Sequence, residues 1–259
     1  MDYVEPADAR AMSGLRLALT TGVPGPWGEA AKAICLVKKL EFVPVRQTAM
    51  EDNADLVAWT GFRNAPQAIY ESEPARIGWE EILALAERLA PEPALVPEDE
   101  GERALMMGMA HALCSEDGLG WCRRLQLLAP MLSAPGADEN PALAGTRVLG
   151  RDYGWSPEAT ARANARVVSI LEFFSSQYAK QRAAGREYLV GEGLSAVDLY
   201  WATFCALLRP LPEAQCAMPE MLRVAYGTTT PETDAVLDEA LVEHRDRVYE
   251  RHIGLPLDF

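Results

Sequence analysis

Histidine is scarce in this sequence, and its cysteines lack the spacing that redox and zinc sites require. The chain contains three histidines and five cysteines, and no two cysteines form a C-x-x-C motif. That absence argues against a redox dithiol and against a zinc knuckle. His111, His244 and His252 are too few and too dispersed to indicate a metal site or a Ser-His-Asp triad. We therefore expect reduced, mostly buried thiols and no metal.

Long apolar runs and a surplus of basic residues are also absent. No stretch approaches the roughly 18–20 apolar residues that span a bilayer. The polar, acidic segment Met1–Gly14 lacks the basic start and apolar core of a signal peptide. The formal net charge of −14 repels a phosphate backbone and argues against nucleic-acid binding. The sequence thus predicts a cytoplasmic protein with no membrane and no nucleic-acid partner.

Strand and helix signals alternate in the first part of the chain, whose 259 residues leave room for two domains. Leu15–Thr20 alternates as a strand does, Glu29–Leu40 is rich in helix formers, and Glu41–Arg46 is strand-like. The segment Thr21–Trp27 is rich in glycine and proline and predicts a loop. This order has the dimensions of a βαβ unit.

A second group of signals completes this α/β part. Pro66 precedes a strand-like run that ends at Tyr70, and Arg76 and Ile77 are expected to form a short fourth strand. Trp79 opens a segment whose apolar residues recur on one helical face. The acidic, proline-containing segment 91–101 has no periodicity and predicts a linker. We place an α/β domain at residues 13–91, the linker at 92–101 and a second domain at 102–259.

The second domain is predicted to be all helical, because strand signals nearly vanish after the linker. Helices are expected at 102–115 and 119–133, a loop at 134–155, a long helix from Pro157 to Gly185, and a last helix from Pro231 to His252.

The sharpest local signal in this domain is a helix start. In Gly193-Leu-Ser-Ala-Val-Asp-Leu199, Ser195 and Asp198 have the spacing of a capping box. Their role is expected to be structural. The helix that follows is almost entirely apolar, as expected of a helix buried at the centre of a domain.

The order of these elements resembles the glutathione-transferase superfamily over almost the whole chain. Two places support the resemblance: Ala65-Pro66, at the start of the third strand, and the capping box formed by Ser195 and Asp198. The resemblance implies a thioredoxin-like α/β N-terminal domain followed by an all-α helical-bundle C-terminal domain. It also implies a cis peptide bond before Pro66 and a homodimer.

The same resemblance implies a transferase that uses glutathione as cosubstrate and a small hydrophobic electrophile as its partner, in a cleft between the domains. The sulfur of glutathione would lie at the N-terminus of the first helix, where the helix dipole favours a thiolate. Its activating donors would be the hydroxyls of Thr20 and Thr21, or the free backbone N–H groups from Trp27 to Glu29. The residues expected to bind glutathione are Trp27, Ala65, Pro66, Arg76, Gly78 and Trp79.

The sequence departs from the family pattern at two points. Gly25-Pro26-Trp27 stands where the family has a Ser, Tyr or Cys that activates the thiol. Ile77 and Gly78 stand where a Glu/Gln-Ser pair is expected to bind the γ-glutamyl group. The alternative is therefore a binding or protein-interaction module that keeps the fold and has lost glutathione chemistry. In either case the second domain is expected to supply one wall of the cleft, with His111, Cys114, Cys122, Arg123 and Arg124 as candidates.

Overall fold

A small mixed sheet organises the N-terminal part of the chain. The computed structural model describes all residues, 1–259. Strand β1 (Leu15–Thr20) is central, parallel to β2 (Val43–Gln47) and antiparallel to β3 (Gln67–Tyr70), in the order β2-β1-β3. Helix α2 (Pro26–Val37) connects the two parallel strands. The expected fourth strand is reduced to a single bridge between Ala68 and Arg76, because the chain turns into a helix three residues later.

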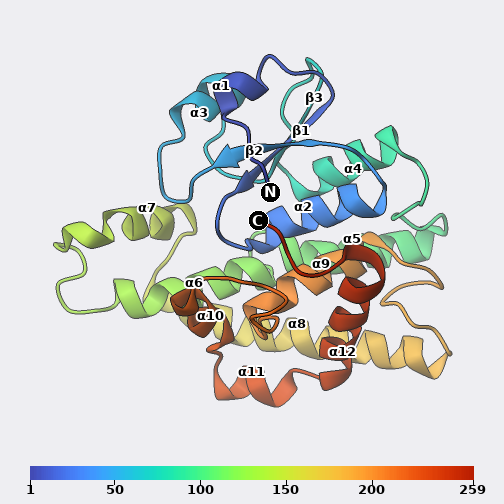
Figure 1. Cartoon of the computed structure of the whole chain (residues 1–259). Helices are drawn as coiled ribbons and strands as arrows, with labels where there is room; N and C mark the ends of the chain where they lie inside the picture. Colours follow the sequence, from blue (N-terminus) through green and yellow to red (C-terminus); the bar gives the residue numbers. More distant parts are fainter.

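Helices cover both faces of this sheet, as Figure 1 shows. On one face Leu15, Leu17 and Leu19 pack against α2 and α4 (Trp79–Leu89). On the other face Ala18 and Val45 pack against α1 (Pro6–Ala9) and α3 (Ala54–Thr60). We call the sheet with α1 to α4 the sheet domain.

The remaining helices form a second layer below the sheet domain in Figure 1, here called the helical domain. They are α5 (Glu100–Cys114), α6 (Leu119–Leu132), the 3-10 turn η1 (Pro141–Leu143), α7 (Ala144–Asp152), α8 (Pro157–Ala183), α9 (Ala196–Phe204), the 3-10 turn η2 (Cys205–Leu207), α10 (Glu220–Gly227), α11 (Pro231–Val236), α12 (Glu239–Val248) and the π-helical turn η3 (Tyr249–Ile253).

Two expectations about these helices are wrong. The predicted loop 134–155 contains η1 and α7, which are held by local bonds: Asn140 caps η1 through the N–H of Ala142, and Arg147 donates to the carbonyl of Ala137. The predicted helix from Pro231 to His252 is divided, because Asp238 caps a new helix through the N–H of Ala240.

Helix α9 is fully buried, and the predicted capping box at its start is present. Asp198 Oδ2 accepts the Ser195 N–H and hydroxyl, each at 2.9 Å, and its Oδ1 accepts the Leu189 N–H at 2.9 Å. His244 of α12 lies 2.8 Å from the same Oδ1 atom. Helix α9 packs against α2, so one hydrophobic core continues from the helical domain into the sheet domain.

The two ends of the chain meet beside α2 (Figure 1). The amino group of Met1 bonds to the Asp258 carboxylate, and Lys32 on α2 donates to the Asp258 carbonyl at 2.6 Å. None of the helices combines the length and apolar composition needed to cross a bilayer.

Candidate functional site

The first turn of α2 presents backbone donors without acceptors. Gly25 is the N-cap residue and Pro26 the first helical residue, and the N–H of Glu29 is the first to bond back, to the carbonyl of Gly25 at 2.9 Å. The N–H groups of Trp27 and Gly28 make no hydrogen bond within the chain. Unsatisfied N–H groups and the helix dipole together favour an anion at this end.

The hydroxyls of Thr20 and Thr21 lie just before this turn and are both engaged by Gln47. Thr20 Oγ1 donates to Gln47 Oε1 at 2.6 Å, and Thr21 Oγ1 lies 3.5 Å from the Gln47 carbonyl. Thr20 faces the space between the domains, whereas Thr21 does not line it. Because the Thr20 proton already has an acceptor, the backbone N–H groups of α2 are the freer donors at this site.

Trp27 and Trp79 extend from the sheet domain to the C-terminal end of α5. Trp27 Nε1 donates to the carbonyl of Cys114 at 2.8 Å, and Trp79 Nε1 donates to Ser115 Oγ at 2.9 Å. The Trp27 ring packs edge-on against Phe204 of α9, with centroids 4.9 Å apart. Both indoles therefore help to hold the two domains together.

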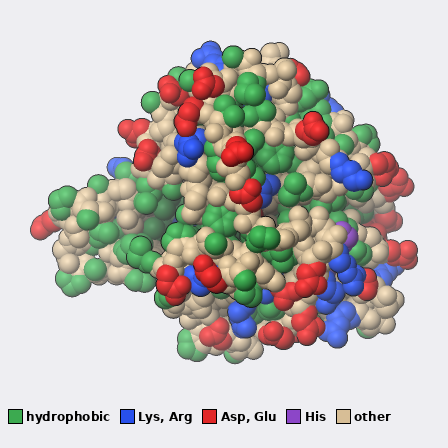
Figure 2. Space-filling model, in the orientation of Figure 1, with side chains coloured by type: hydrophobic (Ala, Val, Ile, Leu, Met, Phe, Trp, Pro, Cys, Tyr) green, Lys and Arg blue, Asp and Glu red, His purple; other side chains and the backbone are tan.

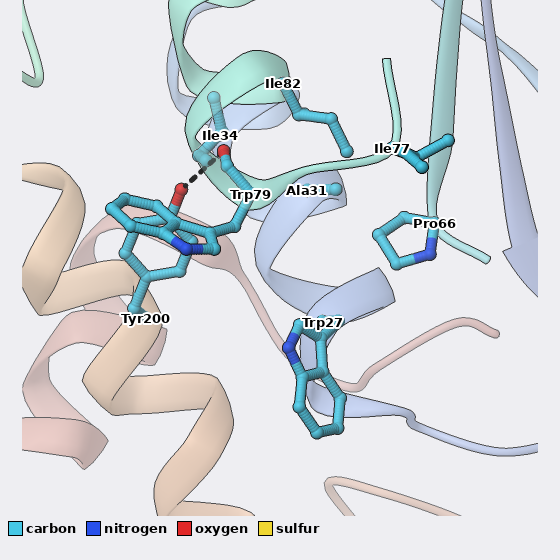
Figure 3. A pocket seen from close by; sticks show the side chains of 8 residues that line it. All are labelled: Trp27, Ala31, Ile34, Pro66, Ile77, Trp79, Ile82 and Tyr200. Atoms are coloured by element: carbon cyan, nitrogen blue, oxygen red, sulfur yellow. Dashed lines mark hydrogen bonds between the residues drawn. The ribbon is translucent and has the colours of Figure 1, made fainter. Parts of the chain in front are cut away.

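Between these two tryptophans lies a narrow pocket, which we call the apolar slot (Figure 3). Its lining residues are Trp27, Ala31, Ile34, Pro66, Ile77, Trp79, Ile82 and Tyr200. The Tyr200 hydroxyl is turned away from it and donates to the Trp79 carbonyl at 3.2 Å. The slot has an empty volume of about 300 Å³, part of which is open to solvent, and no charged side chain in its lining.

The N-terminus of α4 is capped by a carboxylate of the same chain. Glu81 Oε2 accepts the N–H groups of Gly78 and Ile77, each at 3.1 Å. These backbone hydrogen bonds, first that of Gly78 and then that of Ile77, lower the pKa of Glu81. The amide of Gly78, one of the predicted binding residues, is therefore already used.

Arg76, another of the residues expected to bind glutathione, is also engaged elsewhere. Its guanidinium bonds to Glu73 Oε2 at 2.9 Å and to the Pro74 carbonyl at 2.7 Å. It lines neither the apolar slot nor the larger space beside it.

Ala65 and Pro66 lie where the slot meets this larger space, and the peptide bond between them is cis. Neither the N–H nor the C=O of Ala65 has a hydrogen-bond partner within the chain. A ligand with an extended peptide backbone can bond to both groups, as an added strand bonds to a sheet edge.

The larger space is an interdomain cleft with an empty volume of about 1120 Å³, part of which is open to solvent. Its sheet-domain wall includes Leu19, Thr20, Gly28, Met50 and Ala65. Its helical-domain wall is formed by Arg124 of α6, Leu149 and Tyr153 at the end of α7, and Leu222 and Tyr226 of α10. Figure 2 shows the surface hollowed on this side, between α7 and the sheet domain, with hydrophobic side chains gathered in the hollow.

The two neighbouring arginines of α6 have different surroundings. Arg123 is buried and donates to the carbonyls of Leu207, Tyr226 and Thr228. Arg124, the next residue along the helix, faces the cleft. None of the other candidates for this wall lines the cleft; these are His111, Cys114 and Cys122.

Cysteine chemistry has little support in this structure. All five thiols are free and buried. Burial raises the pKa of Cys35 and of Cys122 to about 12, and that of Cys205 to about 11. A thiol must lose its proton to act as a nucleophile. No group of three or more His, Cys, Asp or Glu side chains is arranged to hold a metal ion.

Sequence comparison gives a partial relative and no family. No protein-family model matches the chain. A probable D-serine dehydratase of Burkholderia thailandensis is 31% identical over 176 residues, which are 64% of this chain and 38% of that protein. The chain thus spans less than half the length of the curated relative it matches.

Solved structures match over nearly the full length. A glutathione S-transferase from Methylobacterium radiotolerans in complex with glutathione sulfonate has a TM-score of 0.61 at 14% identity, covering 95% of this chain and 97% of that one. A glutathione S-transferase from Methylobacillus flagellatus with glutathione bound has a TM-score of 0.62 at 12% identity, covering 92% and 95%. A β-etherase from Sphingobium has a TM-score of 0.57 at 17% identity, covering 90% and 99%.

The chain therefore has the glutathione-transferase fold, with a thioredoxin-like sheet domain followed by a helical domain. The fold predicted from the sequence is confirmed.

Proposed function

We propose that this protein is a glutathione-dependent transferase that joins the thiol of glutathione to a small hydrophobic electrophile, or removes it, in the interdomain cleft. The main support is the start of α2, where the N–H groups of Trp27 and Gly28 lack acceptors and border the cleft. Structures of the same fold hold glutathione or glutathione sulfonate. The activity of the D-serine dehydratase is not carried over, because the chain covers only 38% of that protein.

In this proposal the backbone of α2 stabilises the thiolate. Lowering a thiol pKa by about 2 units requires about 2.7 kcal/mol of preferential stabilisation of the thiolate. Hydrogen bonds to a charged group contribute about 1.5–3 kcal/mol each, so two N–H donors with the helix dipole suffice. Thr20 plays a smaller part, because its hydroxyl donates to Gln47. The thiolate then attacks an electrophilic carbon in the cleft, and the S–C bond forms as a leaving group departs or as an activated double bond takes up a proton.

The backbone of Ala65 would orient the tripeptide through its free N–H and C=O. The γ-glutamyl end has no comparable partner, since Glu81 occupies the amides at the start of α4 and Arg76 is paired with Glu73. We therefore expect glutathione to bind in the millimolar rather than the micromolar range.

The second candidate is a binding or protein-interaction module of the same fold that has lost glutathione chemistry and no longer binds glutathione. The observation in its favour is the start of α4, where a carboxylate of the chain stands in the place expected for the carboxylate of a ligand.

Calorimetric titration with glutathione and with S-hexylglutathione separates the two. A millimolar Kd for glutathione, about −4 kcal/mol, with a tighter one for S-hexylglutathione, supports the transferase. No heat from either ligand supports the binding module. Ultraviolet titration of the bound thiolate then tests the donors. Thr20→Val should leave the bound thiol pKa nearly unchanged, with Thr21→Val as the matched control. A return of that pKa to its value in free solution in Thr20→Val alone would assign the activation to the Thr20 hydroxyl.

A further inference from the structure

Arg124 differs in its surroundings from the other charged group that lines the interdomain cleft. Glu29, the only acid in the lining, is paired with Lys32 at 2.8 Å. Arg124 makes no ion pair, and no carboxylate is near enough to influence its pKa. A cation without a counter-ion is unexpected on a cleft wall of a protein whose net charge is −14.

Two tyrosines lie beside this guanidinium. Its central carbon lies 5.8 Å from the centroid of the Tyr153 ring, and the hydroxyls of Tyr226 and Tyr153 are close enough to accept hydrogen bonds from it. Burial alone would lower the pKa of Arg124, but these two hydroxyls raise it overall, so it stays charged. Because each hydroxyl accepts from the guanidinium, its own proton remains available to a ligand. The guanidinium fork and two hydroxyl donors match the oxygen atoms of a carboxylate.

The rest of this wall is apolar. Leu149 and Leu222 flank the polar group, and Met50 faces them from the sheet domain. Low-dielectric walls strengthen the attraction between a lone cation and an anion.

We propose that the interdomain cleft selects electrophiles that carry a carboxylate on an apolar body, with the carboxylate held by Arg124, Tyr153 and Tyr226 on the helical-domain wall. The electrophilic carbon would then face the start of α2. As a statement about the acceptor substrate, this inference rests on the proposed transferase function.

Binding can be tested without glutathione, by calorimetric titration with naphthylacetate and with its neutral isostere naphthylacetamide. The wild-type protein should bind the acid more tightly than the amide. Arg124→Gln should weaken the binding of the acid by about ten- to hundredfold and leave the affinity for the amide unchanged. Arg124→Lys keeps the charge without the fork and should recover part of the loss. Arg151→Gln is the matched control, because Arg151 lies on α7 two residues from Tyr153, is exposed and does not line the cleft. Equal binding of acid and amide, or an equal loss in Arg151→Gln, would overturn the inference.

A second arm decides whether the carboxylate belongs to the electrophile or to glutathione. S-hexylglutathione should bind Arg124→Gln as tightly as the wild type, and a tenfold or larger loss would instead assign Arg124 to a carboxylate of glutathione. This titration and the melting temperature also show whether the variant is folded.

The turnover arm uses ethacrynic acid and its methyl ester. The thiolate adds to the β-carbon of their activated double bond and the α-carbon takes up the proton, so the reaction has no leaving group. Arg124→Gln should lower kcat/KM about ten- to hundredfold for the acid and little for the ester. Arg124-dependent binding of naphthylacetate with no turnover of either compound would refute the transferase and retain the anion site. Turnover with equal losses for acid and ester would retain the transferase and refute the anion site.

Discussion

Replacement of Asp198 by alanine tests the central polar contact of the helical domain. Its carboxylate is fully buried and accepts the N–H groups of Leu189 and Ser195 and the hydroxyl of Ser195, each at 2.9 Å. The His244 ring lies 2.8 Å away. One side chain thus fixes the start of α9, the segment before it and one face of α12.

The magnitude follows from the groups left behind. A buried donor without an acceptor costs about 1–3 kcal/mol, and Asp198→Ala leaves two backbone donors and the His244 ring unpaired. Because such losses in one network are not additive, we expect a total of about 3–5 kcal/mol. A chain of this size loses about 2–4 °C in Tm per kcal/mol, so Tm should fall by about 6–20 °C.

Thermal unfolding followed by circular dichroism measures this loss, with Ser195→Ala as the control. That variant keeps the Asp198 carboxylate and its backbone bonds, and removes one hydroxyl at a cost of about 1 kcal/mol. Asp198→Asn keeps one acceptor oxygen and should lie between the two. A Tm of Asp198→Ala no lower than that of Ser195→Ala would show that the network contributes no more than the cap itself.

Three further outcomes follow from the structure. Because burial raises the pKa values of all five thiols, they should not react with Ellman's reagent in the native protein and should all react in denaturant. One rapidly reacting thiol in the native protein would contradict this prediction. Gly120→Ala would place a methyl carbon 2.4 Å from Phe204 and 2.7 Å from Trp27. It should lower the unfolding free energy, measured in urea, by about 1–3 kcal/mol. Gly108→Ala is the control, because the space around Gly108 is open, and it should not destabilise the protein. Partial burial lowers the pKa of His252 below 6.5, so its contribution to stability is present above that pH and lost as pH falls through the folded-state value. His252→Gln should therefore flatten the fall in unfolding free energy on acidification. An unchanged slope would contradict the lowered pKa.

Local signals made much of the fold predictable. The capping box at Ser195 and Asp198 and the apolar face that begins at Trp79 both depend on residues close in sequence. Helix α7 could not be found in this way, because it is held by Arg147 bonding to carbonyls of a preceding loop.

The site was less predictable because its chemistry depends on side-chain partners. Nothing in the sequence indicates that Arg76 bonds to Glu73, or that Glu81 reaches back to the amides of Ile77 and Gly78. The pair Arg123 and Arg124 could be assigned to a wall of the cleft, but not divided between core and cleft. Adjacent positions on a helix face different directions, and the packing of α6 on neighbouring segments decides which one is buried.

The two cavities imply an orientation for any thiol peptide bound here. A γ-glutamyl group carries an ammonium and a carboxylate, and burying either in the apolar slot without partners would cost several kcal/mol. Trp27 and Trp79 are tied to the end of α5, so the slot cannot widen without breaking those bonds between the domains. The free polar groups, at Ala65 and at the start of α2, all border the cleft instead. The polar parts of the peptide must therefore lie along the cleft edge, and only an apolar substituent can occupy the slot.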